Sequence, residues 1–291
     1  MRWPFPGETR SLDDAARAEA PGRFVELPDG AVHYELAGPE QGDVVVLVHG
    51  FSVPFYVWDP TFAALTRAGF RTLRYDLYGR GYSDRPRGPY DRSLFDRQLL
   101  NLLDTLGLDE PVHLVGLSMG GPIVGTFADR HPARVRRLVL IDPAGFQTGR
   151  SALGRWLRFP VVGEVILSLF GRRLLLASQR EDFFRPERFP EYFPKYLPQM
   201  RYRGFRSALL SSLRHGMLDD MRPVYRRVSE RHPVLLFWGR EDRTIPFELS
   251  RNAVAAMPSA VFHPVDEAGH LPHYERPEVV NPLLIAFLQE E

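Results

Sequence analysis

The sequence of 291 residues contains no cysteine. Disulfide bonds, thiolate metal sites and cysteine nucleophiles are therefore excluded, and any nucleophile of this chain must attack through oxygen or nitrogen. Lysine is almost missing as well, since Lys195 is the single lysine among 37 basic residues. We attribute this second bias to genomic base composition.

The sequence also lacks an excess of charge and a long hydrophobic run. Its net charge of +1 gives no reason to expect nucleic acid as a partner. The longest apolar stretch, residues 161–170, contains Gly163 and Glu164 and is too short to span a bilayer. The first seven residues do not resemble a signal peptide, because two prolines interrupt them. We therefore expect a cytoplasmic protein.

Apolar runs and helical segments alternate along most of the chain. Short alternating stretches at 24–27 and 32–36 flank the Pro28-Asp29-Gly30 turn and predict a hairpin. Near-continuous apolar runs lie at 44–48, 70–75, 112–115, 135–141 and 234–238. Such runs are typical of strands buried on both faces of a parallel sheet. A further strand is predicted at 261–265. Predicted helices lie at 60–68, 92–106, 119–130, 247–256 and 277–288. The alternation predicts an α/β fold with a doubly wound, mostly parallel sheet.

One interval, from residue 146 to 223, has no buried-strand pattern and is too long for a structureless loop. We predict a helical cap over 146–224, inserted into a core formed by 23–145 and 225–291, with an N-terminal arm over 1–22. Cap helices are expected at 151–159, 161–179 and 205–217. The cap holds 13 arginines and Lys195 against 7 acidic residues. This charge suits contact with an anionic lipid surface, although scattered solvated arginines explain it better.

The segment Gly116-Leu117-Ser118-Met119-Gly120 directly follows a predicted strand and opens a predicted helix. A sharp turn from strand to helix places the serine at its apex, with the hydroxyl exposed and backbone amides nearby. The glycines are needed because the neighbouring strand and helix approach the turn closely. The pattern predicts Ser118 as a nucleophile.

A serine nucleophile needs a base and a group that orients the base. His270 lies in a loop between the strand 261–265 and the last helix, and Asp242 follows the strand 234–238. Both therefore lie at the carboxyl ends of strands, where sites of open α/β sheets form. Three other residues are candidates for the acid that orients His270: Asp142, at the end of the strand 135–141, Glu241 and Asp266. His263 and His273 are expected to be structural.

Two backbone amides are candidates for the oxyanion hole. The strand 44–48 runs into His49-Gly50-Phe51, where glycine allows the chain to turn so that the Phe51 amide faces the serine. The Met119 amide begins the helix after Ser118. We expect His49 to shape this loop by hydrogen bonding. No cluster of histidines and carboxylates has metal-ligand spacing, so no metal or organic cofactor is expected.

These motifs resemble the serine hydrolases of the α/β-hydrolase fold. The stretch from Asp76 to Ser83 resembles the family's Asp-x-x-Gly-x-Gly-x-Ser segment, and Gly269-His270 with Glu275-Arg276-Pro277 resembles its C-terminal signature. The stretches 113–121 and 142–145 are similar to those of monoacylglycerol lipases and related carboxylesterases. The resemblance covers the chain apart from the arm and the cap. It implies a triad of Ser118, Asp242 and His270.

The expected activity is hydrolysis of a small carboxylic ester with an apolar acyl chain through an acyl-enzyme. Substrate contacts are expected from Phe51 and from cap aromatics, although packing explains any single one of them: Trp156, Phe159, Phe183, Phe184 and Phe193. One alternative is carbon–carbon bond hydrolysis of aromatic ring-cleavage products, although the segment 49–54 lacks the Gly-Pro-Gly of many such enzymes. Another is a ligand-binding protein without catalysis. The sequence does not indicate an oligomeric state.

Overall fold

The computed structural model describes residues 3–146 and 152–290. Its sheet has eight strands: β1 (Arg23–Leu27), β2 (Gly30–Ala37), β3 (Val44–Val48), β4 (Arg71–Tyr75), β5 (Val112–Leu117), β6 (Val135–Ile141), β7 (Val234–Gly239) and β8 (Val261–Val265). Their order across the sheet is β1-β2-β4-β3-β5-β6-β7-β8. β1 and β2 are antiparallel to their neighbours, and the others run parallel. The carboxyl ends of β5 to β8 therefore meet at one edge.

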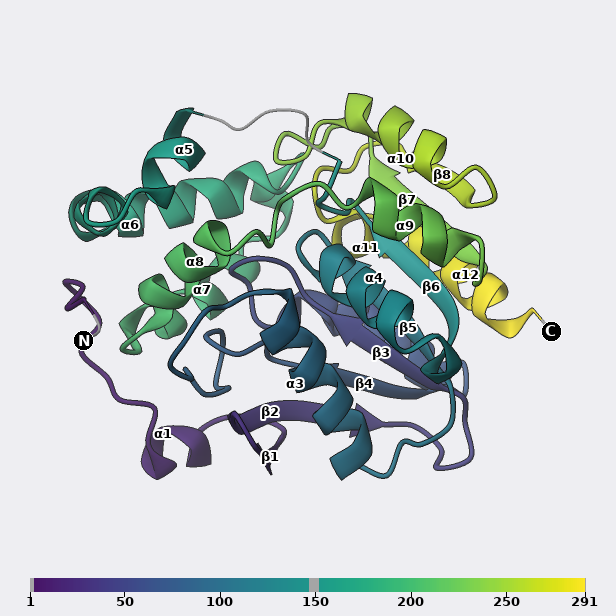
Figure 1. Ribbon diagram of the computed structural model, residues 1–291, viewed down its shortest axis with the longest axis horizontal. Helices are drawn as coiled ribbons and strands as arrows, with labels where there is room; N and C mark the ends of the chain where they lie inside the picture. The colour runs from purple at the N-terminus through teal and green to yellow at the C-terminus, as the bar shows by residue number, and fades with distance from the viewer. Residues whose placement is uncertain (1–2, 147–151, 291) are drawn as a thin grey trace.

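Helices cover both faces of this sheet (Figure 1). One face packs against α2 (Asp59–Arg67), α11 (Pro272–Glu275) and α12 (Pro277–Gln289). The other packs against α3 (Arg92–Thr105), α4 (Gly120–Arg130), α9 (Arg222–Ser229) and α10 (Ser250–Ala256). The remaining helices are α1 (Asp14–Ala18), α5 (Ala152–Arg158), α6 (Val162–Glu181), α7 (Tyr192–Tyr196) and α8 (Phe205–Arg214).

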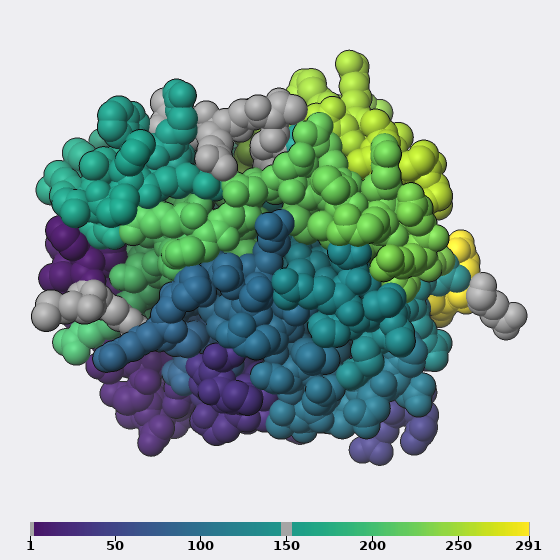
Figure 2. All heavy atoms as spheres, viewed as in Figure 1, coloured from purple at the N-terminus to yellow at the C-terminus, as the bar shows by residue number. Residues whose placement is uncertain are grey.

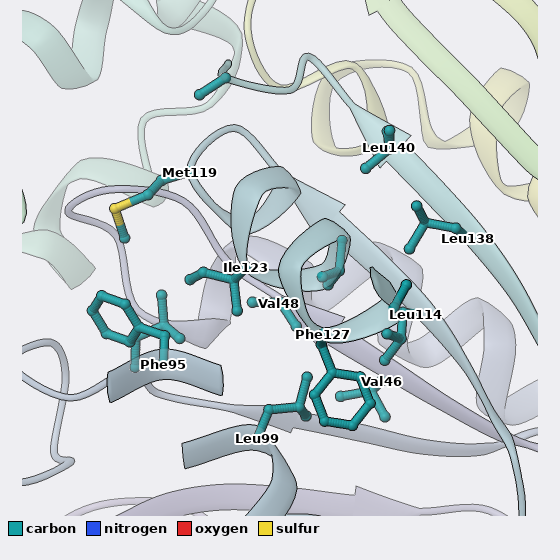
Figure 3. Packing of buried hydrophobic residues seen from close by; sticks show 14 of the residues in the cluster. Val46, Val48, Phe95, Leu99, Leu114, Met119, Ile123, Phe127, Leu138 and Leu140 are labelled. Atoms are coloured by element: carbon teal, nitrogen blue, oxygen red, sulfur yellow. The ribbon is translucent and has the colours of Figure 1, made fainter. Parts of the chain in front are cut away.

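Successive residues of the central strands enter two different cores. Val46 and Leu114 pack with Ile123 and Phe127 of α4, as Figure 3 shows. Their neighbours along the strands, such as Val45, point to the opposite face and pack with α2 and α12. This two-sided burial explains why the strands are apolar at nearly every position.

The predicted fold class is confirmed. The strands β3, β6 and β8 begin and end at the predicted residues, and the other strands differ from the prediction by at most two residues at either end. The predicted helix at 247–256 is a 3₁₀ turn, Phe247–Leu249, followed by α10. The short helices α1, α7, α9 and α11 were not predicted, because three of the eight residues of α9 are arginines and the other three helices are at most five residues long. Residue 151, where a cap helix was expected to begin, lies outside the described residues.

Between β6 and β7, the part of the chain that the structure describes adds no strand to the sheet. The helices α5 to α8 occupy most of this interval and lie together at one side of the sheet (Figure 1), and α9 follows them on the sheet face. An ion pair of 2.7 Å between Lys195 of α7 and Asp59 of α2 links them to the rest of the molecule. We keep the name cap for residues 152–224, and the domain boundaries stay a prediction.

The N-terminal arm is more firmly attached than the sequence indicates. Phe5 is 4% exposed and packs against Leu167 of α6 and Leu210 of α8. The carboxylate of Glu8 accepts hydrogen bonds from the amides of Gly204 and Arg206 at 2.7 and 2.8 Å. The expectation that residues 1–22 lie apart from any core is therefore wrong for this segment. A single buried phenylalanine within a charged, proline-rich stretch gave no pattern from which the contact could be predicted.

Candidate active site

Ser118 occupies the turn between β5 and α4. Its φ of 53° lies in the left-handed region that non-glycine residues rarely adopt, and it is 8% exposed. The flanking glycines allow the turn to close: a Cβ on Gly116 would lie 2.7 Å from the Gly120 carbonyl oxygen, and one on Gly120 would overlap the Val48 carbonyl. The local geometry is thus the strained strand–turn–helix that the sequence predicts.

His270 and Asp242 are brought together from the ends of β8 and β7. Nδ1 of His270 lies 2.7 Å from Oδ2 of Asp242. The other carboxylate oxygen of Asp242 accepts from the amides of Thr244 and Ile245, both at 2.8 Å, which fixes the carboxylate. Burial alone would lower the pKa of His270, but the charge and hydrogen bond of Asp242 outweigh it and raise the pKa above its usual value. A carboxylate so held orients the imidazole and stabilises its protonated form.

Asp142, the competing acid, lies behind this pair at the end of β6. Its Oδ1 accepts from the Gly239 amide at 2.9 Å, and its Oδ2 is buried without a hydrogen-bond donor. Burial and the charge of Asp242 hold the pKa of Asp142 well above its usual range. This shift favours the protonated form of Asp142, whose hydroxyl can donate to Asp242. The structure therefore pairs His270 with Asp242, next to a neutral Asp142.

Asp142, Asp242 and His270 also lie close enough to share a cation, since one potential ligand atom of each falls within 4.8 Å of the others. The expectation of no metal rested on sequence spacing, which does not detect ligands from three separate strands. A cation would replace the hydrogen bond that orients His270. We therefore assign the cluster to proton sharing.

Backbone hydrogen bonds connect Ser118 to the same sheet edge. Its amide donates to Ile141 at 2.9 Å, and its carbonyl accepts from Ala144 at 3.0 Å. The adjacent Asp142 amide donates to Phe237 of β7. Because β5, β6, β7 and β8 are neighbours in the sheet, Ser118, Asp142, Asp242 and His270 follow one another along the edge.

The predicted oxyanion turn lies directly against Ser118. A Cβ placed on Gly50 would come within 3.2 Å of the Ser118 Cβ, so only glycine leaves this approach unstrained. His49 bonds the Gly50 carbonyl through Nδ1 and accepts from the Leu77 amide at Nε2, both at 2.9 Å. Burial lowers the pKa of His49 to about 4. It is thus a neutral residue that holds this loop, in the structural position expected for it.

A buried guanidinium supports the oxyanion turn from behind. Arg80 is fully buried; its Nε donates to the Phe51 carbonyl at 2.8 Å and one Nη to Ser212 of α8 at 2.9 Å. No carboxylate pairs with it in the described part of the chain. Burial lowers its pKa to about 9, so it stays charged at pH 7. This positive charge favours negative charge on an oxygen bound near Phe51 and Met119. Nothing in the sequence indicates this role, because a charged residue in a glycine-rich segment such as 79–81 is typical of a surface loop.

Two acidic residues join the cap to the His270 loop, and neither is among the predicted site residues. The backbone carbonyl of Asp182, which follows α6, accepts from the His270 amide at 2.7 Å. Glu275 accepts from the amides of Gly269 and Phe184 at 2.7 and 2.9 Å, and burial raises its pKa to about 7. Only the position of Glu275 within the family-like C-terminal segment could have pointed to it.

The aromatic residues expected at the substrate pocket separate into two groups. Phe183 is buried among other rings, with Tyr192 at 4.8 Å and Tyr274 at 6.0 Å between centroids, and Phe184 and Phe193 are partly buried. Trp156 and Phe159 are each 57% exposed on or beside α5. These two rings lie on the surface, so in this structure they do not line a closed pocket. They face outward because the opposite side of α5 and α6 is already packed against α8.

The other acidic and histidine candidates have structural contacts. Glu241 accepts from the Ala268 amide, and Asp266 pairs with Arg240 at the surface. His273 bonds the Val57 carbonyl, and burial lowers its pKa to about 3. His263 stacks on Phe237.

The chain is similar to a family of known proteins and to several individual members of it. Residues 45–283 match the family described as Alpha/beta hydrolase family. The chain is 30% identical to a 2-hydroxy-6-oxononadienedioate/2-hydroxy-6-oxononatrienedioate hydrolase of Paraburkholderia phymatum, over 92% of this chain and 96% of that protein. It is also 30% identical to a 2-hydroxymuconate semialdehyde hydrolase of Pseudomonas putida, over 86% and 88%. A solved thermophilic esterase from Thermogutta terrifontis is 25% identical, with a TM-score of 0.79 and coverage of 92% and 98%.

Proposed function

Since the chain belongs to the alpha/beta hydrolase family, we propose that it is a serine hydrolase in which Ser118, His270 and Asp242 form the catalytic triad. The observation that carries the proposal is the 2.7 Å bond between His270 and Asp242 at the sheet edge that also bears the Ser118 turn. A hydrolase scaffold kept only for ligand binding would not require this arrangement.

In the proposed reaction, His270 takes the proton from the Ser118 hydroxyl as its oxygen attacks a carbonyl carbon. The Phe51 and Met119 amides donate to the resulting oxyanion, and the charge of Arg80 adds to their effect. The tetrahedral intermediate collapses, the bond to the leaving group breaks, and that group receives the proton from His270. Water, deprotonated by the same histidine, then releases the acid and regenerates Ser118.

For the bond that is broken, we propose a carbon–carbon bond of an aromatic ring-cleavage product. The support is the names of two relatives that are 30% identical over most of both chains. In this case the leaving group is a carbon atom, which takes up the proton. This candidate takes precedence over the ester hydrolysis that the sequence motifs favour.

Ester hydrolysis is the second candidate, because the similar esterase structure covers most of the chain. The two reactions share the nucleophile, the base and the oxyanion donors and differ in the leaving group. The geometry near Ser118 therefore suits both. Substrate identity would have to come from residues of the cap that face Ser118.

The test compares wild type, Ser118→Ala and the control Ser178→Ala on 2-hydroxymuconate semialdehyde and on p-nitrophenyl acetate and butyrate. Ser178 is an exposed residue of α6. We expect wild type and Ser178→Ala to hydrolyse the semialdehyde with the larger kcat/KM, and Ser118→Ala to lose at least about 10³-fold with an unchanged circular dichroism spectrum. A larger value on the esters would favour the second candidate. No turnover of any substrate, or an unaffected Ser118→Ala, would refute the serine-hydrolase proposal.

A further inference from the structure

Exposed apolar side chains are concentrated at one place on the cap. Eight of the twelve large apolar residues that are exposed in the described part of the chain fall within residues 153–170. We define the cap patch by six of them, each between 42% and 70% exposed: Trp156, Phe159, Val161, Val165, Leu169 and Phe170. Large exposed apolar patches usually mark surfaces that bind a partner or a membrane.

Helix periodicity explains how α6 presents this patch. Gly163, Leu167 and Gly171 form its buried side, where Leu167 packs against Phe5 of the arm. Val165 and Leu169 lie away from that side and are exposed. The helix is therefore apolar on two sides, and only one of them is covered. Figure 2 shows that α5 and α6 protrude as a rim at the upper left of the molecule.

The turn that begins α6 is strained. Val161 has a φ of 67°, a conformation that a β-branched residue rarely adopts, and it is 59% exposed. The Trp156 and Phe159 rings lie next to each other just before it, with 6.0 Å between their centroids. The strained turn thus brings the aromatic end of α5 beside the exposed side of α6, and no packing of Val161 compensates for the strain.

The charges around the cap patch have one sign. Residues 152–180 contain five arginines and one acid, Glu164. Glu164 is neutralised by Arg214 at 2.6 Å. Arg155, Arg172 and Arg173 are exposed, and none of the three has an ion pair with another described residue. The apolar patch is therefore surrounded by uncompensated positive charge.

This charge selects among potential partners. In a symmetric dimer the same patch would meet its own copy, and the arginines of the two chains would repel each other. An anionic bilayer complements both the positive charge and the apolar side chains of the cap patch. Its phosphates attract arginine, and the region between its headgroups and acyl chains accepts apolar side chains. Tryptophan is also enriched at the level of lipid headgroups. No helix within the described residues is long and apolar enough to cross a membrane.

We propose that the cap patch docks the protein on the surface of anionic lipid bilayers. The helix α6 lies in the plane of the interface, its exposed apolar side chains enter the headgroup region, and Arg155, Arg172 and Arg173 contact phosphates. This surface lies outside the candidate active site. The proposal therefore holds whichever bond the enzyme cleaves.

The test is flotation of the full chain with vesicles of phosphatidylcholine alone or mixed with phosphatidylglycerol. We expect wild type to bind the mixed vesicles at least about tenfold more tightly than the neutral ones, with weaker binding in high salt. The double variant Leu169→Glu/Phe170→Glu should lose at least about tenfold on the mixed vesicles. Arg172→Gln/Arg173→Gln should remove most of the preference for phosphatidylglycerol.

The matched control is Val254→Glu, which places the same charge on α10 at a residue that is 38% exposed and outside the cap patch. It should bind like wild type, and all variants should retain wild-type kcat/KM on a soluble substrate. Wild type that does not bind the mixed vesicles, or glutamate variants that bind as well as wild type, would overturn the proposal. A wild-type dimer in sedimentation velocity that becomes monomeric in the glutamate variant, without vesicle binding, would assign the patch to a second copy and would also overturn it.

Discussion

The carboxyl groups of Asp142 and Asp242 share one buried site but differ in their hydrogen-bond partners. Asp242 accepts two backbone amides and the His270 ring, whereas Asp142 accepts one amide and lies next to a charge of the same sign. Donors stabilise an ionised carboxylate, and burial beside another charge opposes it. The difference in environment therefore makes Asp242 the partner of His270 and raises the pKa of Asp142.

This assignment predicts opposite effects of two isosteric variants. Asp242→Asn should reduce kcat/KM by about 10⁴-fold, because the imidazole loses the carboxylate that fixes its tautomer. Asp142→Asn should stay within about threefold of wild type, since an amide also donates to Asp242 and asparagine tolerates the φ of 43° at this position. The measurement is kcat/KM with both soluble substrates. The reverse order of the two variants would identify Asp142 as the orienting acid.

The pH dependence of the same reaction reports on His270. The base must be neutral, so kcat/KM should fall as the pH drops through a pKa that Asp242 holds above the usual 6.5. Removing that charge in Asp242→Asn should move this acid limb to lower pH, on top of the lower rate. In Asp142→Asn the limb should keep its wild-type position. A limb that stays unchanged in Asp242→Asn would contradict the pairing.

At the scale of elements, the loop after β3 and the turn after β5 function as one unit, because Gly50 lies against Ser118. In Gly50→Ala the new methyl group would lie 3.2 Å from the Ser118 Cβ and displace the Phe51 amide. We expect kcat to fall by about 10² to 10³-fold, the range for losing one oxyanion donor, with a smaller change in the melting temperature. The control is Gly107→Ala, which meets open space but has a φ of 65°. Gly107→Ala should lower stability and leave kcat unchanged. Equal losses of kcat in both variants would contradict the proposal that Gly50 positions the Phe51 amide against Ser118.

The same elements show which features a single sequence can reveal. Two buried parallel strands were predicted to the residue: β3, which is apolar at every position, and β6, which is apolar apart from Arg136 and Arg137. The glycines at 116 and 120 indicated the serine turn. Contacts between segments distant in sequence had no such pattern. The bond from the His270 amide to the Asp182 carbonyl and the bond from the Arg80 guanidinium to Ser212 of α8 depend on how the cap sits on the sheet. Local periodicity carries no information about that placement.

At the scale of the whole molecule, the arm connects cap and sheet. Glu8 and Phe5 hold it against the cap, and Arg17 pairs with Asp84 of the core at 2.6 Å. The cap is therefore fixed by a segment that precedes β1 as well as by its own two connections. Loss of one arm contact should loosen the entire segment.

We predict that Phe5→Ala exposes the arm to trypsin, with cleavage after Arg10 or Arg17 about 100-fold faster than in wild type. Truncating a buried phenylalanine costs about 3 kcal/mol, and proteolysis follows the population of the open form. The rate is measured by mass spectrometry under native conditions, with Thr9→Ala as a control because Thr9 is an exposed residue of the same arm. Cleavage of Phe5→Ala at the wild-type rate would show that the arm does not depend on this contact.

The ion pair between Lys195 and Asp59 has a practical consequence. Lys195 is the single lysine side chain of the protein, and its ammonium group lies at the contact between α7 and α2. A reagent that acylates amines therefore reacts with one side chain, and the ion pair with Asp59 slows that reaction. Pulsed acylation followed by mass spectrometry would report changes at the contact between α7 and α2 without any introduced probe.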